Sequence, residues 1–129
     1  MSKYFLDSWA WIEYFEGATR GEKVREAITN PRNQIFTHCV SVAEIISKAR
    51  RTGKDTDVIF EAITSNSNIV EGNVEDSKNV GIVHATIKTT RNRNFSLADA
   101  FVLASARKLK AKVITGDPDF KNIDEAVLI

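Results

Sequence analysis

The stretch Lys112-Val-Ile-Thr-Gly-Asp-Pro-Asp-Phe120 joins a short β-branched run to two closely spaced acids. A similar arrangement opens the chain, where the apolar run Tyr4-Phe-Leu6 ends at Asp7. Short runs rich in aromatic and β-branched residues are typical of buried strands. We expect strands at residues 3–6, 34–37, 68–70 and 112–115, and the tail 126–129 either adds a last strand or packs against the sheet.

Helical patterns separate these strands. They lie at residues 9–15, 22–29, 42–51, 58–63, 74–89 and 97–110. The last is the clearest, with Leu97, Phe101 and Leu109 among its inward-facing residues. Strands that alternate with helices predict a three-layer α/β/α sandwich around a central, mainly parallel sheet. The sequence has no internal repeat or linker, so residues 1–129 are expected to form a single domain.

Composition limits the classes of function. A hydrophobic fraction of 43% supports a packed core, and a net charge of +1 provides no global attraction for a polyanion. The single cysteine, Cys39, excludes an internal disulfide and is interpreted as a buried thiol in a reducing compartment. No signal-peptide pattern opens the chain and no apolar run reaches the ~18 residues of a membrane span. We expect a cytoplasmic protein without a membrane partner.

Four acids follow a common rule. Asp7 and Asp117 stand where strands end, whereas Glu44 and Asp99 each follow a serine by three residues. If those serines open helices, all four carboxylates lie at strand ends or helix starts, which share one edge of a parallel sheet. Several carboxylates on one edge, with no basic residue beside them, indicate a divalent-metal site.

Helix capping is the competing explanation. Ser-x-x-Glu and Ser-x-x-Asp are capping boxes, and Asp117 before Pro118 is a natural N-cap. Taken singly, each acid is better explained as a cap than as a ligand. Capping does not require an acid at every such site, however, and two carboxylates ~4 Å apart repel by about 4 kcal/mol at an effective dielectric of 20. Four together therefore favour a bound cation.

Two motifs go beyond capping, Ser96-Leu-Ala-Asp-Ala100 and Thr115-Gly-Asp-Pro-Asp-Phe120. With Phe5-Leu-Asp-Ser8 and Val42-Ala-Glu44, they resemble the PIN-domain nucleases, especially the small toxin ribonucleases of the VapC type. The resemblance implies an acidic site for Mg²⁺ or Mn²⁺, a homodimer and a small antitoxin partner. It assigns the catalytic and metal-binding acids to Asp7, Glu44, Asp99 and Asp117, a further metal-binding acid to Asp119, and supporting hydroxyls to Ser8 and Thr115.

The chemistry of these residues agrees with the resemblance. Hard cations prefer oxygen ligands, and a bound metal can activate water and stabilise charge on a phosphate. We hypothesise in-line hydrolysis of an RNA phosphodiester that leaves a 5′-phosphate and needs no side-chain nucleophile.

Cations near the acids would hold the flanking phosphates of an RNA substrate. Arg91 and Arg93 are the best candidates because their segment runs into the helix that carries Asp99. A second basic cluster is expected to project away from the site; it comprises Lys48, Arg50, Arg51 and Lys54. Trp9 is interpreted as a core residue or, if exposed, as part of a dimer or antitoxin surface.

Two alternatives keep the PIN fold, and two others belong to different folds. A PIN nuclease could mature RNA without being a toxin, and an inactive PIN fold could serve only for binding. Haloacid-dehalogenase-like phosphatases also use an Asp-x-Asp pair, but Asp117 and Asp119 come too late in the chain for that fold. A phosphoacceptor receiver domain would need a Lys after the last strand, where Gly116 stands.

Overall fold

The computed structural model describes all residues 1–129 and contains one parallel sheet of five strands in the order β3-β2-β1-β4-β5. The strands are β1 (Ser2–Leu6), β2 (Asn33–His38), β3 (Asn68–Val70), β4 (Lys112–Thr115) and β5 (Ala126–Leu128). The helices are α1 (Ser8–Glu16), α2 (Thr19–Thr29), α3 (Cys39–Arg51), α4 (Thr56–Asn66), α5 (Val74–Thr90), α6 (Leu97–Leu109) and the 3₁₀ turn η1 (Pro118–Phe120). Every predicted strand is confirmed, and the tail adds a fifth.

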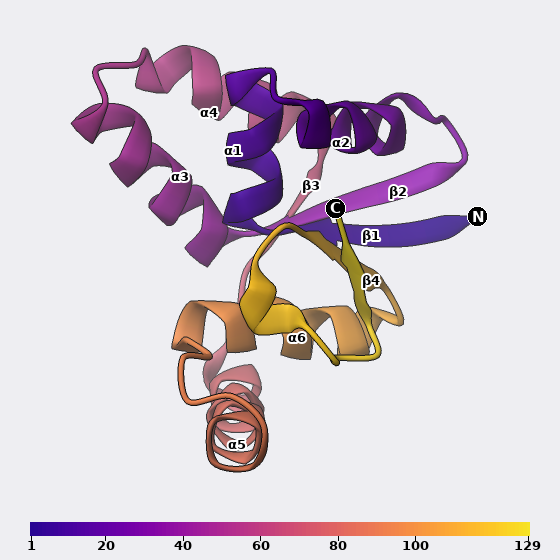
Figure 1. Cartoon of the computed structure of the whole chain (residues 1–129), viewed down its shortest axis with the longest axis vertical. Coiled ribbons are helices and arrows are strands. Elements are labelled where there is room, and N and C mark those ends of the chain that lie inside the picture. The colour runs from indigo at the N-terminus through magenta and orange to yellow at the C-terminus, as the bar shows by residue number, and fades with distance from the viewer.

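The helices form two layers, one on each face of the sheet. Helices α1 to α4 lie on one side and α5 and α6 on the other (Figure 1). Successive strand residues point to opposite faces, so Phe5 and Val113 pack under α5 and α6 while Leu6 and Ile114 pack under α1 to α4. Each face therefore has its own apolar core, and the predicted α/β/α sandwich is confirmed.

The start of α3 differs from the prediction. This helix begins at Cys39, and His38 is its cap, because the Val40 amide donates to His38 Nδ1 at 3.0 Å. Ser41 is consequently a buried helical residue rather than a cap, and Glu44 lies in the second turn. The prediction of a buried thiol is also wrong, because Cys39 is exposed where the chain turns from strand into helix.

Two further findings concern apolar surfaces. Leu97 was expected to face inward, but it is the first residue of α6 and is 55% exposed. No helix in the structure has both the length and the apolar character needed to span a bilayer.

Candidate acidic metal site

The carboxyl ends of β1 and β4 and the N-terminus of α6 bring the predicted acids together. Asp7 follows β1 and caps α1, Asp117 follows β4 and caps η1, and Asp99 is the third residue of α6. The two strands are direct neighbours in the sheet, with Leu6 paired to Ile114. The residues after them must therefore emerge side by side.

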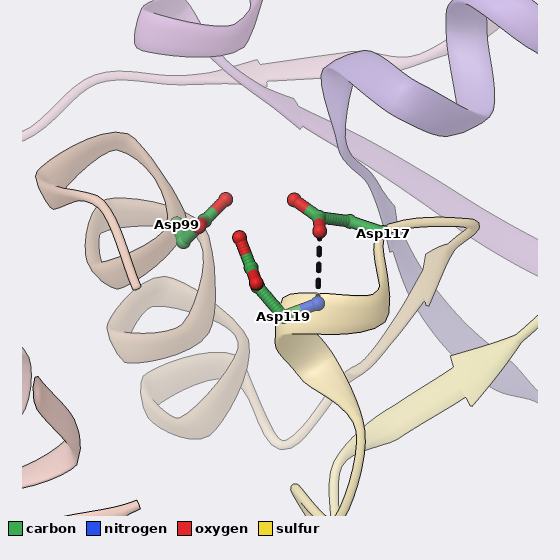
Figure 2. Close-up of side chains that lie close together, drawn as sticks. All are labelled: Asp99, Asp117 and Asp119. Carbon is green, nitrogen blue, oxygen red and sulfur yellow. Dashed lines mark hydrogen bonds between the residues drawn. The ribbon is translucent and has the colours of Figure 1, made fainter. Parts of the chain in front are cut away.

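Asp99, Asp117 and Asp119 form the centre of the site. One carboxylate oxygen from each lies within 4.8 Å of the others, and the three side chains point toward a common space (Figure 2). Asp117 accepts the Asp119 amide at 2.9 Å, and Asp119 accepts the Asn92 side-chain amide at 3.1 Å. None of the three forms an ion pair with a basic residue. An all-oxygen, uncompensated donor set of this kind suits Mg²⁺ or Mn²⁺.

A capping box fixes Asp99. Its amide donates to Ser96 Oγ at 3.0 Å, and its Oδ2 accepts the Ser96 amide at 3.1 Å. The capping explanation and the metal-site explanation are thus compatible here. One carboxylate oxygen holds the helix start, and the side chain also faces the other acids.

Asp7 lies beneath this centre. It is only 4% exposed, its Oδ1 accepts the Ala10 amide at 2.9 Å, and its Oδ2 accepts the Thr115 hydroxyl. Thr115 Oγ1 in turn accepts the Asp117 amide at 2.9 Å. Thr115 therefore links the two acids, so the hydroxyl predicted to support the site is in contact with it.

The pKa values of Asp7, Asp99 and Asp117 reflect the cost of gathering carboxylates in a partly buried site. Burial raises the pKa of Asp7 to about 7, against the hydrogen bonds from Thr115 and Ala10, and the charges of Asp99 and Asp117 add to the rise. Burial raises the pKa of Asp99 and of Asp117 as well, with further contributions from neighbouring acids. Loss of hydration and repulsion both disfavour the charged forms, and a cation would relieve the repulsion.

Glu44 joins the site from α3. It is exposed as a residue and stands at the rim of the same groove as Asp99, Asp117 and Asp119. Desolvation of its carboxylate and repulsion from Asp99 raise its pKa, while a hydrogen bond from Ser8 lowers it. Ser8, which was predicted to support the acidic site, thus contacts one of its acids. The structure brings all seven predicted acids and hydroxyls to one edge of the sheet.

The basic residues are arranged differently from the prediction. Lys48 and Arg51 line the acidic groove, although the cluster to which they belong was expected to project away. The reason is helical spacing, because residues 44, 48 and 51 share one face of α3. Arg50 and Lys54 do not line the groove. Dividing the cluster by helical face, rather than treating it as one patch, would have identified the two groove residues.

Arg91 and Arg93 line a polar hollow that adjoins the groove. Its wall is the segment from Lys88 to Asn94, and Asn94 also lines the acidic groove. The Arg91 guanidinium donates to the Asn122 carbonyl at 3.0 Å. Their assignment to RNA binding stays a prediction.

Comparison with known proteins agrees with this geometry. The PIN domain family matches residues 4–126. No curated protein matches the sequence significantly.

Solved structures share the fold at low identity. A toxin–antitoxin complex from Klebsiella pneumoniae is 22% identical, with a TM-score of 0.70, and the alignment covers 96% of this chain and 95% of that one. The VapC20 toxin of Mycobacterium tuberculosis, described as cleaving the sarcin–ricin loop, is 16% identical with a TM-score of 0.74 and 98% coverage of both chains. VapBC-1 from nontypeable Haemophilus influenzae is 21% identical with a TM-score of 0.71, covering 98% of this chain and 96% of that one.

The family match spans nearly the whole chain, and the acidic cluster stands at the sheet edge where the sequence places it. Together they support a nuclease assignment. The chain belongs to the PIN domain family.

Proposed function

We propose that this protein is a divalent-metal-dependent endoribonuclease and the toxin of a toxin–antitoxin pair that acts in the cytoplasm. The observation that carries the proposal is the convergence of three carboxylate oxygens within 4.8 Å, with no basic residue paired to any of them. Such a set is unfavourable without a cation, and a divalent cation bound by acids supports phosphodiester hydrolysis, the chemistry that membership of the PIN domain family favours.

Asp99, Asp117 and Asp119 would hold Mg²⁺ or Mn²⁺, and Asp7 and Glu44 add negative charge around them. The bound cation would supply a more acidic water and a positive charge for the phosphate oxygens. The chain's own part is positioning. Ser96 orients Asp99, Asn92 orients Asp119, and Thr115 couples Asp117 to Asp7.

RNA is the proposed substrate and an antitoxin the proposed partner. Both follow from the solved neighbours, which include toxin–antitoxin complexes and a toxin that cleaves the sarcin–ricin loop. A homodimer belongs to the same proposal, and light scattering at micromolar concentration checks it. A monomer at that concentration would remove the dimer from the proposal and leave the nuclease site unaffected.

An RNA cleavage assay tests the enzymatic part. The wild type with Mn²⁺ is expected to produce RNA fragments with 5′-phosphate ends and to lose this activity in EDTA. Asp99→Asn and Asp117→Asn should each reduce cleavage by at least about 100-fold, because each removes a ligand charge.

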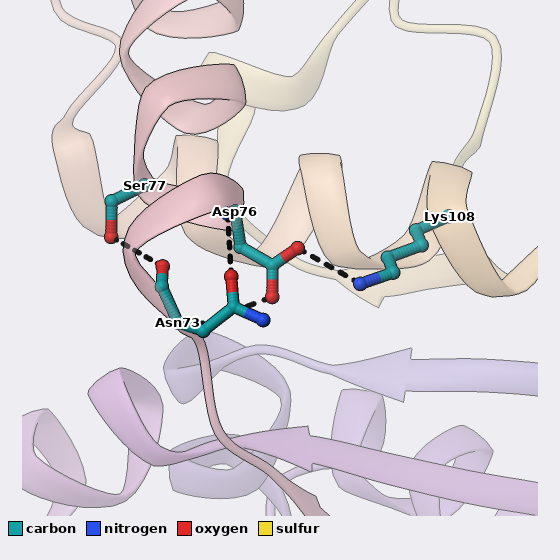
Figure 3. A network of polar contacts seen from close by, with 4 residues as sticks. All are labelled: Asn73, Asp76, Ser77 and Lys108. Carbon is teal, nitrogen blue, oxygen red and sulfur yellow. Dashed lines mark hydrogen bonds and ion pairs between the residues drawn. The ribbon is translucent and has the colours of Figure 1, made fainter.

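Asp76→Asn is the matched control. Asp76 occupies the same third position in the capping box of α5 that Asp99 occupies in α6. Its carboxylate pairs with Lys108 Nζ at 2.9 Å (Figure 3), and neither residue lines the acidic groove. The Asp76→Asn variant should therefore cleave RNA like the wild type. Undiminished cleavage by folded Asp99→Asn, or by the wild type in EDTA, would contradict the proposal.

A further inference from the structure

Trp9 of α1 and the cations Lys48 and Arg51 of α3 all line the acidic groove, and we refer to the lining that these two helices contribute as the α1–α3 wall. We propose that this wall is a subsite for one unpaired nucleotide beside the scissile phosphate, with its base stacked on Trp9 and its phosphate held by Lys48 and Arg51. The proposal rests on the ribonuclease function and specifies which side of the groove holds the substrate strand.

The indole of Trp9 is held in place while part of it stays open. A Cβ atom added to Gly116 would lie 3.1 Å from Trp9 Cε3, so the ring packs against the backbone directly before Asp117. Trp9 nonetheless remains 40% exposed, in contrast to Trp11, which is fully buried and donates from Nε1 to Thr37 Oγ1 at 3.0 Å. An indole that is fixed by packing and partly exposed, next to the proposed nuclease site, is suited to stacking on a base.

The two cations are free to bind an anion. Arg51 forms no ion pair, and its Nε donates only a 3.4 Å hydrogen bond to Ser47. Lys48 lies 4.0 Å from Glu16, a loose and exposed pair that contributes little to stability. Neither cation is paired with the acids of the groove, so those acids do not neutralise the charge of Lys48 or Arg51.

The combination favours a nucleotide over a protein partner. A phosphodiester strand offers both an anion and an aromatic face in each repeat, which matches the two cations and the indole on one wall. The base must be unstacked from its own strand to reach Trp9, so the subsite selects single-stranded RNA.

Fluorescence anisotropy with a labelled unstructured RNA 12-mer tests the subsite, using the Asp99→Asn background to prevent cleavage. Two double variants are compared. The first combines Lys48→Gln and Arg51→Gln, and the second combines Arg50→Gln and Lys54→Gln. The wild-type net charge is +1, so the Asp99→Asn parent carries +2, and both pairs lower that net charge to 0; only the first pair lines the groove. The first pair should flatten the dependence of log K on log salt by about 0.7 per lost phosphate contact, and the second pair should not.

Trp9→Ala should weaken binding by about 5- to 150-fold, and Trp9→Phe should restore most of it, because stacking needs only an aromatic face. A duplex of the same sequence should bind more weakly than the 12-mer and should not respond to Trp9→Ala. Thermal melting of each variant confirms that it is folded.

Equal salt slopes for the two charge pairs, unchanged binding by Trp9→Ala, or no binding of the 12-mer at low salt would each overturn the subsite. Unchanged RNA binding by Trp9→Ala together with loss of the dimer in light scattering would instead assign Trp9 to a protein interface. These outcomes are separate from the proposed nuclease function, which is judged by cleavage and by metal binding.

Discussion

Asp7 is the residue whose environment is most unlike that of an ordinary acid. Its carboxylate is buried, both of its oxygens accept hydrogen bonds from the protein, and its pKa is raised to about 7. In the unfolded chain the same group has a pKa of 3.8. The native state therefore binds the Asp7 proton more tightly than the unfolded state does. Its charged form is costly until a cation is bound nearby.

This difference predicts the pH dependence of stability. Between pH 4 and 7 the native state binds more protons than the unfolded state, so the free energy of unfolding falls as pH rises, by at most about 1.4 kcal/mol per pH unit from Asp7. Asp7→Asn removes this contribution and can still accept the Ala10 amide. Urea unfolding of both proteins in EDTA should show the variant gaining stability relative to the wild type from pH 5 to pH 7. Parallel pH profiles would show that Asp7 does not titrate in this window.

Residue identities at the site were largely predictable, but residue environments were not. Asp7, Asp99 and Asp117 were identified because strand ends and capping boxes leave local sequence signals. The burial of Asp7 depends on Thr115, which lies 108 residues away, and no local pattern encodes that contact. Lys48 and Arg51 were misplaced although their helical spacing was visible in the sequence.

Among the secondary-structure elements, α5 and α6 begin with the same capping motif, but the acid of that motif has a different role in each helix. Each has a complete capping box, formed by Asn73 and Asp76 in α5 and by Ser96 and Asp99 in α6. In α5 the acid pairs with Lys108, whereas in α6 it faces other acids (Figures 2 and 3). The capping motif therefore stabilises both helices but orients a ligand in only one.

Substitution of the two caps separates these roles. Ser96→Ala and Asn73→Ala should each lower the free energy of unfolding by about 1 kcal/mol, because each leaves a helix amide without its acceptor. Only Ser96→Ala should also weaken Mn²⁺ binding, by about 10-fold, because it loosens Asp99. Chemical denaturation and calorimetry on both variants check this. An equal effect of the two substitutions on Mn²⁺ affinity would contradict the orienting role of Ser96.

The packing of α1 against α2 depends on Gly21. It is buried, and a Cβ added there would overlap the carbonyl oxygen of Glu13 in α1. Gly21→Ala should therefore cost about 1–3 kcal/mol of unfolding free energy. Gly81→Ala is the control, since Gly81 lies within α5 with open space around it and should gain about 0.5–1 kcal/mol. A neutral Gly21→Ala would mean that α2 shifts away from α1 without cost.

Element boundaries were predictable to within a few residues, and the start of α3 shows why they were not predicted more closely. The start of α3 was placed at residue 42 because Ser41 resembles a cap, but His38 caps this helix through its ring nitrogen. Histidine is not a usual N-cap, so sequence preference pointed to the wrong residue. Because α3 begins at Cys39, Glu44 lies in the second turn of the helix rather than the first, and it still lines the acidic groove.

For the whole molecule, the parallel sheet explains why acids distant in sequence converge. The order β3-β2-β1-β4-β5 places β1 and β4 side by side, so the residues that follow them open onto the same edge. Alternation of strands and helices predicted the layers. The strand order was not predictable, because it is set by which helices pack on which face (Figure 1).

The central claim concerns a metal held at this edge, and a calorimetric titration of Mn²⁺ into the wild type, Asp99→Asn and Asp76→Asn tests it most directly. We expect saturable binding below millimolar metal by the wild type and by Asp76→Asn, and loss of that binding in Asp99→Asn, because only Asp99 faces the other carboxylates. A wild type that binds no Mn²⁺ up to millimolar concentration, or an Asp99→Asn variant that binds it equally well, would contradict the account.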